Sequence, residues 1–326
     1  MGSYYSTEST KSNESNETTN NVECTVDTVE GTVETVESIN SDGIITTSEN
    51  IVEVVLKDNN QPTIFETQES NILEIVTTKI DVLKKILRLI GEVTSECQFS
   101  FQNVNEGGRI IVTELHDNKT ILLKLVLKGT GFDFYKCSKS KITAKLYLPD
   151  IDEALGLIGA DDTNTNPIII SMKKDKETSI FITRMDNSGF TEQVELPCKE
   201  SVGLDIPLPK TTFQGKIVIN AEKFRKICER ICSVSDLIKI SLTDKEVSFS
   251  SKYYNLDFRY KHSVESKVLG QTIENYFFID GMLKFIKYFK SSDEISIYIK
   301  KDFPLVIHGP FDNFGSVYIF TSPIEE

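Results

Sequence analysis

Four short segments with helical periodicity interrupt a chain that otherwise has the residue pattern of β-strands, and this alternation constrains the fold more than any other feature. The segments begin near Ile80, Asp150, Asn220 and Asp280. Short runs rich in β-branched and aromatic residues occupy residues 72–148 and again residues 216–321, as is typical of antiparallel strands. The sequence therefore predicts an α+β fold of two similar halves, each with two helices and many strands.

Shifts in composition mark the boundaries of these halves. Residues 1–70 are rich in Ser, Thr, Asn and Glu, and we expect a disordered tail because such a segment buries too little apolar surface to offset the entropy of ordering. Within this tail, residues 51–70 contain the apolar run IVEVVL and could instead form a short strand or a docking segment. Residues 195–212 hold three prolines and no periodicity, which predicts an exposed connector between domains at 71–194 and 213–326.

The acidity of the chain is concentrated in the predicted tail. The formal net charge is -13, and residues 1–70 contribute -12 of it through fourteen Asp or Glu residues against two lysines. The remaining 256 residues are close to neutral, so their positive charges can be segregated onto one surface. The overall charge therefore does not exclude a nucleic-acid partner.

Three of the four predicted helices carry bases opposite their apolar residues. Lys84 and Arg88 stand one turn apart, and Lys223, Lys226 and Arg230 share a face. One such helix is weak evidence, because solvated faces often carry Lys and Arg, but three at repeated positions indicate binding to the phosphate backbone of duplex DNA. The candidate DNA-binding residues are Lys84, Lys85, Arg88, Lys223, Arg225, Lys226, Arg230, Lys284, Lys287 and Lys290.

The second predicted helix, at residues 149–159, departs from this pattern. It offers Asp150, Asp152 and Glu153 and no basic residue. If all four helices line one surface, this helix weakens the positive field there.

The sequence contains no recognisable catalytic or metal-binding pattern. His116, His262 and His308 lie on separate predicted strands or turns without metal-ligand spacing. The motifs GxxxxGK[ST], GxSxG and HExxH are absent. We expect no enzymatic activity, no cofactor and no metal, although catalytic residues that meet only in three dimensions remain open.

Cysteine usage and hydropathy bear on the compartment. The six cysteines lack CxxC spacing, which favours reduced thiols in an intracellular protein. No apolar run approaches the roughly 18 residues of a membrane span. We therefore expect a protein with no membrane partner.

Several segments resemble the sliding-clamp family of proliferating cell nuclear antigen. GFDFYKC at residues 131–137 is similar to the family's GFDxYxC strand, and VLKKIL at residues 82–87 is similar to its opening helix. FRKICERI (224–231), DFPLVIHG (302–309) and the ending SPIEE (322–326) follow in the family's order. The resemblance covers residues 71–326 and leaves a cellular or a viral origin open. It implies two clamp domains, with sheets outside and the four helices lining the inner face of a ring of three identical chains.

The resemblance also implies two contact surfaces. The subunit interface would pair residues 179–185 of one chain with residues 255–261 of the next, through Ile180, Ile182, Arg184, Leu256, Phe258 and Tyr260. A groove for short hydrophobic partner peptides would lie beside the connector and the last strand. Its residues would be Leu115, Leu122, Val202, Leu204, Ile206, Pro207, Pro304, Ile319, Phe320 and Pro323.

The function that the resemblance implies is that of a DNA polymerase processivity factor. The expected partners are double-stranded DNA, two further copies of the chain, a DNA polymerase, a clamp loader, and replication or repair proteins with short docking peptides. The expected location is the site of DNA replication, in the nucleus of a cell or in a virus-infected host. Two alternatives keep the fold: a monomeric or dimeric accessory subunit, and a checkpoint-type scaffold.

Overall fold

The computed structural model describes most of the chain beyond residue 51. The described residues are 52–55, 64–67, 70–104, 107–159, 166–185, 189–199, 211–261, 264–268 and 270–324, with the backbone alone for the first two ranges and for Met185. Residues 50–326 form one compact unit.

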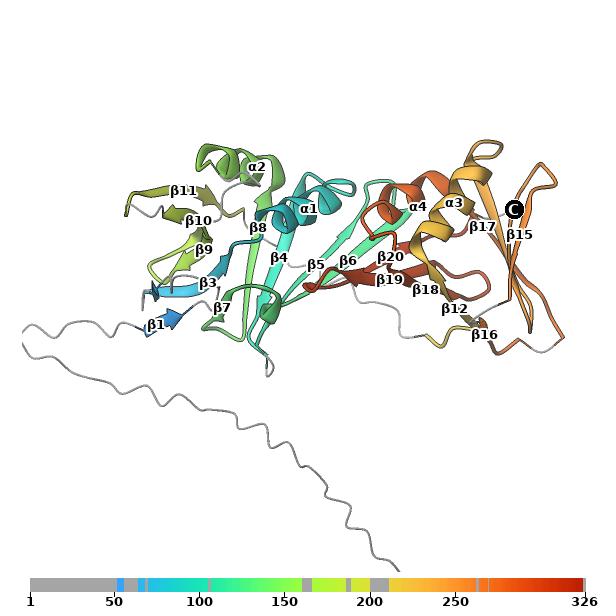
Figure 1. The fold of residues 1–326 in the computed structure, drawn as a ribbon, viewed down its shortest axis with the longest axis horizontal. Helices are drawn as coiled ribbons and strands as arrows, with labels where there is room; N and C mark the ends of the chain where they lie inside the picture. Colours follow the sequence, from blue (N-terminus) through green and yellow to red (C-terminus); the bar gives the residue numbers. More distant parts are fainter. Residues whose placement is uncertain are drawn as a thin grey trace, which may run out of the picture. The chain divides into compact units, whose positions relative to one another are not determined.

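A strand, a helix and three further strands recur four times along the described residues (Figure 1). The first copy consists of β3 (Asn71–Thr77), α1 (Ile80–Gly91), β4 (Glu96–Gln102), β5 (Arg109–Leu115) and β6 (Ile121–Lys128). The second consists of β8 (Lys141–Tyr147), α2 (Leu148–Leu157), β9 (Ile168–Lys173), β10 (Lys176–Met185) and β11 (Thr191–Pro197). The third consists of β12 (Gly215–Asn220), α3 (Ala221–Cys232), β13 (Leu237–Leu242), β14 (Val247–Ser251) and β15 (Asp257–Tyr260). The fourth consists of β17 (Ile273–Phe278), α4 (Ile279–Ile286), β18 (Glu294–Ile299), β19 (Leu305–Phe311) and β20 (Gly315–Thr321).

Short elements link the copies within each half. A single 3-10 turn, η1 (Gly129–Gly131), and strand β7 (Phe134–Cys137) connect the first two copies. Strand β16 (Val264–Ser266) lies between the third and the fourth.

The copies pair in twos, because the first strand of each copy hydrogen-bonds to the strand that follows the helix of the other. In the first half β3 pairs with β9 and β8 with β4, and in the second half β12 pairs with β18 and β17 with β13, all antiparallel. Strands β6 and β20 then pair from Ile121↔Thr321 to Leu127↔Gly315 and join the halves. The result is a nine-stranded sheet (β16-β12-β18-β19-β20-β6-β5-β4-β8), flanked by a five-stranded sheet (β11-β10-β9-β3-β7) and a four-stranded sheet (β15-β14-β13-β17).

Local signals explain where the helices begin and end. The side chain of Asn220 caps α3, because its Oδ1 accepts a hydrogen bond from the backbone N–H of Lys223 at 3.1 Å. Pro149 lies in the first turn of α2, where its missing N–H costs nothing. Each helix has an acidic residue in its first turn, and α1, α3 and α4 have a basic residue in the last. This polarity complements the helix dipole.

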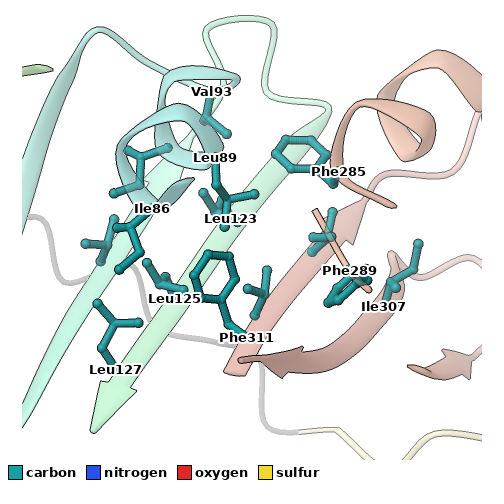
Figure 2. Close-up of a cluster of buried hydrophobic side chains, with 14 of the residues drawn as sticks. Ile86, Leu89, Val93, Leu123, Leu125, Leu127, Phe285, Phe289, Ile307 and Phe311 are labelled. Carbon is teal, nitrogen blue, oxygen red and sulfur yellow. The ribbon is translucent and has the colours of Figure 1, made fainter. Parts of the chain in front are cut away.

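The hydrophobic core continues across the joint between the halves. Figure 2 shows Leu89 of α1 and Leu123 and Leu125 of β6 close to Phe285 of α4 and to Phe311. All five side chains are fully buried, and burying each contributes about 2 kcal/mol. The predicted α+β class, with antiparallel sheets and four helices in the described residues, is confirmed.

The observed strands bear on two of the predicted boundaries. The predicted tail contains a two-stranded antiparallel sheet of β1 (Val52–Val55) and β2 (Ile64–Thr67), which matches the ambiguity noted for residues 51–70. The predicted connector begins too early, because Glu195–Pro197 belong to β11 and pair with Ser179–Phe181 of β10. Residues 200–210 of that connector lie outside the described residues. The division into domains at 71–194 and 213–326 stays a prediction.

Candidate nucleic-acid interface

The four helices lie in a row on one side of the strands, in the order α2, α1, α4, α3 (Figure 1). Helix α1 contacts α2, and α3 contacts α4. The halves meet between α1 and α4, where Lys287 Nζ, one residue past α4, lies 2.8 Å from Oε1 of Glu92, the residue after α1. We call the solvent-facing side of this row the helix face.

The side chains of all ten predicted DNA-binding residues are at least partly exposed. Arg88 of α1 and Lys223 and Arg230 of α3 are among the fully exposed ones. Lys223 Nζ also lies 4.6 Å from the centroid of the Tyr260 ring, a cation–π contact. The acidic side chains of α2 are exposed as well, so the helix face carries both signs of charge.

Carboxylates on the same helices neutralise part of the basic charge. In α3, Arg225 pairs with Glu222, Lys226 Nζ lies 3.3 Å from the same carboxylate, and Arg225 Nε lies 3.7 Å from Glu229. In α4, Lys284 pairs with Asp280 at 3.0 Å. These pairs join residues three or four positions apart, the spacing at which helical side chains meet. The positive field is therefore weaker than the count of predicted bases indicates.

Two further carboxylates, Asp312 and Glu92, form ion pairs that connect α1 or the residue after it to segments of the second half. Asp312, in the turn between β19 and β20, lies 3.2 Å from Lys85 Nζ of α1 and also binds Lys290. Burial raises the pKa of Asp312, but hydrogen bonds from Lys290 and Lys85 outweigh burial and leave the pKa below its ordinary value. No helical periodicity could have shown this contact, because Lys85 and Asp312 are 227 positions apart.

Glu92 forms the second of these contacts. It accepts hydrogen bonds from Lys287 Nζ and from the hydroxyl of Tyr288, both at 2.8 Å. Burial alone would raise the pKa of Glu92, but these hydrogen bonds and the charges of Lys287 and Lys284 lower it. At neutral pH both Glu92 and Asp312 are therefore negatively charged.

Part of the predicted peptide groove forms a continuous apolar row on the nine-stranded sheet. Leu115 is in register with Leu122, and Leu122 with Phe320, across β5, β6 and β20. Leu115 is 38% exposed, and the other two are half-buried, as are Pro304 and Pro323. A row of partly exposed apolar side chains on a protein surface can bind a short hydrophobic peptide.

The prediction for Ile319 is wrong. Its side chain is 0% exposed and is in register with the equally buried Leu123. Successive residues of a strand point to opposite faces, so Ile319 faces the core whereas Phe320 faces outward. The connector residues predicted for this groove, Val202, Leu204, Ile206 and Pro207, lie outside the described residues.

The sequence did not reveal an aromatic cluster that continues this row. Phe320 is in register with Val306, and Val306 with Tyr298. The ring of Phe213 lies 5.3 Å from that of Tyr298 and 5.8 Å from that of Phe303. The only sequence signal for this cluster is the alternation of residues along β18 and β19. That alternation shows which residues lie together on a surface only once the pairing of the strands is known.

The prediction that residues 179–185 form a subunit edge is wrong. Strand β10 lies inside the five-stranded sheet, with β9 on one side and β11 on the other. Ile180 and Ile182 are each 1% exposed, and Arg184 donates to the backbone carbonyls of Ile158 and Gly159 at 2.7 and 3.0 Å. The strand at the open edge is β11 instead.

The second predicted edge has the expected position. Strand β15 pairs only with β14 among the named strands and ends the four-stranded sheet. Leu256, Phe258 and Tyr260 are half-buried and pack against the core. Backbone groups on the outer side of β11 and β15 are thus available to another strand.

The described residues provide neither a metal cluster nor a membrane span. No group of three or more His, Cys, Asp or Glu residues among them is placed to bind a metal ion. His308 stacks on Tyr318 with ring centroids 4.2 Å apart, and burial, aided by the charge of Lys216, lowers its pKa. His262 lies outside the described residues. No described helix combines the length and the apolarity needed to cross a membrane.

Comparison with known proteins places this architecture in a family. The family model described as "Proliferating cell nuclear antigen, N-terminal domain" matches residues 72–201. A protein of Acanthamoeba polyphaga mimivirus named "Uncharacterized protein L823" is 94% identical over the full length of both chains. A second protein of that virus, "Probable DNA polymerase sliding clamp", is 29% identical over 79% of this chain and 63% of its own length.

The chain belongs to the proliferating cell nuclear antigen family. A crystal structure of the family protein from Thermococcus kodakaraensis has the same fold, with a TM-score of 0.63 and 16% identity over 77% of this chain and all of that one. Both of the relatives compared by sequence are proteins of Acanthamoeba polyphaga mimivirus.

The proliferating cell nuclear antigen domain match spans β3 to β11. It therefore includes both β10, the strand that the sequence resemblance assigned to the edge, and β11, the strand at the open edge. Strands β10 and β11 are consecutive antiparallel partners, so an alignment that is shifted by one strand exchanges one for the other. Only the pairing of strands decided between them.

Proposed function

We propose that this proliferating cell nuclear antigen relative is a DNA polymerase processivity factor, a sliding clamp that closes as a homotrimer around duplex DNA. One observation carries the proposal: a row of four helices lies on one side of the strands, and the five-stranded and four-stranded sheets that flank the nine-stranded sheet end in two unlike strands, β11 and β15. Unlike edges on one chain favour head-to-tail contacts, which close into a ring when the rotation fits.

The two edges are chemically complementary. Val194 and Leu196 on β11 and Phe258 and Tyr260 on β15 are buried or half-buried, on faces that continue into the core. On the exposed face, β11 presents Glu195, whereas β15 and the residue after it present Arg259 and Lys261. Pairing β11 of one protomer with β15 of the next extends the sheet, covers the apolar residues and opposes unlike charges.

The helix face would then line the hole of the ring. Its exposed bases contact phosphates and its carboxylates keep those contacts weak. Arg88, Lys223 and Arg230 are candidates because their side chains are exposed. A topological ring needs only such weak contacts, since closure and not affinity keeps it on DNA.

The apolar row of Leu115, Leu122 and Phe320 would dock the partners. We propose that it binds short hydrophobic peptides of a DNA polymerase, a clamp loader, and other replication or repair proteins. The clamp itself performs no catalysis. It acts at the site of viral DNA replication in the infected cell.

A test of the ring combines mass with topology. Sedimentation at micromolar concentration should give three times the chain mass of 36.8 kDa. Protein loaded on nicked circular DNA should remain bound in high salt and leave when the circle is cut. A monomer that binds linear and circular DNA equally would instead establish the non-ring accessory subunit. A trimer that fails to lengthen polymerase products on primed circles would support the scaffold alternative.

A further inference from the structure

Glu92 and Asp312 each form an ion pair between the two halves, Glu92 with Lys287 and Asp312 with Lys85, and Asp312 also pairs with Lys290. We propose that these two carboxylates compete with DNA phosphates for Lys85, Lys287 and Lys290, and so set how strongly the clamp grips DNA. The inference rests on the proposed function, because it assumes that the helix face meets DNA.

Two lysines bind the Asp312 carboxylate, so Asp312 occupies a position where these lysines could otherwise bind another anion. Lys85 of α1 and Lys290, beyond α4, converge on its two carboxylate oxygens, although they come from different halves. The Asp312 side chain is 14% exposed. The neighbouring Phe311 ring, whose centroid is 5.0 Å from Lys85 Nζ, also holds that lysine in place. A phosphate that approached Lys85 or Lys290 would have to displace a carboxylate already bound.

Glu92 repeats the arrangement at the end of α1. Its carboxylate is bound by Lys287 and by the hydroxyl of Tyr288, and its side chain is 24% exposed. The Lys287 side chain is 50% exposed, so it can turn from Glu92 to solvent without a change in the backbone. The side chains of Lys85 and Lys290 are 30% and 59% exposed, which leaves room for the same movement.

This arrangement differs from the pairs within α3 and α4. Glu222 and Asp280 pair with bases of their own helix. These pairs neutralise charge within one helix and do not connect that helix to another segment. Glu92 and Asp312 each draw together α1 and the segment after α4. When a lysine exchanges one of these carboxylates for a phosphate, one charged contact replaces another, and the net gain per contact is small. Small gains keep each contact exchangeable and allow the ring to move along the duplex.

The competing explanation is that both carboxylates only tether α1 to α4. In that case their removal would leave DNA affinity unchanged, or would lower it as the lysines lose their positions. The two explanations therefore predict opposite changes in DNA binding.

The test compares full-length E92Q/D312N with a matched control, E177Q/E265Q. The control also removes two carboxylates from ion pairs, Lys139–Glu177 and Lys216–Glu265, whose residues belong to strands and a turn and to none of the four helices. Asn tolerates the left-handed backbone at Asp312, where φ is 47°. Binding to a linear duplex of about 30 base pairs is measured between about 50 and 200 mM salt.

We expect E92Q/D312N to bind the duplex more tightly than both the wild type and the control. Each lysine that reaches a phosphate steepens the slope of log K against log salt by about 0.9, which is about a 3.5-fold larger loss of affinity across this salt range. Replacing Lys85, Lys287 and Lys290 by Gln in the E92Q/D312N background should remove the gain. An E92Q/D312N protein with wild-type affinity and slope, or weaker binding, overturns the inference.

Two controls keep the result interpretable. The single variants E92Q and D312N are measured as well, so that a folding defect in the double variant leaves each carboxylate tested separately. Wild-type retention on nicked circles is measured in parallel. If the wild type stays on circles but E92Q/D312N has an unchanged salt slope, only the proposed competition is refuted. If the wild type never encircles DNA, the proposed function is refuted.

Discussion

At the scale of single residues, the charge on the helix face depends on contacts that the linear sequence hides. Asp312 lies in a turn of the last hairpin, yet it binds Lys85 of the first helix. Glu92 follows that first helix, yet it binds Lys287 beyond the last one. These two carboxylates hold the halves together where the core joins Leu123 to Phe285 (Figure 2).

The pH dependence of stability should report these two residues. The pKa of each is lowered from ordinary values of 3.8 for Asp312 and 4.5 for Glu92. A lowered pKa in the folded state contributes stability above the unfolded-state value, and this contribution disappears as pH falls through the folded-state value. At pH 7 the wild type should exceed E92Q/D312N by about 1–2 kcal/mol in the free energy of unfolding.

Denaturant unfolding of both proteins at pH 7 and again at about pH 3 measures this difference. The difference should become smaller at the lower pH, because a pH of about 3 lies below the ordinary pKa values of both carboxylates and the stabilisation is lost as pH falls toward their folded-state values. A difference of the same size at both pH values would show that packing, and not charge, accounts for it.

At the scale of elements, the open strands β11 and β15 determine what the chain can assemble into. Both lie at the ends of flanking sheets, and each has an apolar side and a charged side. Exposed large hydrophobic residues also precede each edge: Phe190 before β11 and Tyr253 and Tyr254 before β15 are 61%, 70% and 60% exposed. Such residues favour a partner on these edges.

A charge exchange tests the pairing of these elements. In the proposed pairing of β11 with β15, R259E places a second negative charge near Glu195, and like charges across strands cost up to about 1 kcal/mol per interface. Trimer dissociation, measured by sedimentation over a range of concentrations, should therefore increase about fivefold. The substitution E195K alone should have the same effect, for the same reason. The double variant E195K/R259E should recover the wild-type dissociation, and a failure to recover would exclude this contact.

At the scale of the whole molecule, the fold separates the surface proposed to contact DNA from the surface proposed to bind partner peptides. The helices lie on one side of the nine-stranded sheet, and the apolar row of Leu115, Leu122 and Phe320 lies on strands that both halves contribute. The joint at β6 and β20 therefore builds a docking surface that neither half has alone. Changes to one surface should leave the other intact.

The variant L122A/F320A tests this separation. Both side chains are half-buried, so their truncation should destabilise the fold by only about 1–2 kcal/mol each. We expect the variant to sediment as a trimer and to remain on circular DNA, but to lose the increase in polymerase extension length. The control is Y147A, because Tyr147 is 38% exposed on β8, the strand that ends the same sheet, outside the apolar row. Loss of extension in Y147A as well would indicate a general defect.

The sequence predicted the elements better than their positions in the sheets. Strands and helices have strong local signals, and the predicted fold class followed from them. Residues 168–170 of β9 and 180–182 of β10 are consecutive apolar residues, whereas the burial of β11 alternates along the strand. This difference does not by itself give the strand order, which is known only once the hydrogen bonds of β10 to β9 and β11 are assigned.

What the sequence by itself determined was the repeated pattern of strands and helices, the bases on three of the helices and the family. Periodicity encodes these, since it depends on residues close together in the chain. The tertiary structure alone decided which strand is the open edge, that Ile319 faces the core, and that Glu92 and Asp312 hold three of the predicted DNA-binding lysines. The physical reason is that strand order and ion pairing join residues up to 227 positions apart, and no local pattern records such distances.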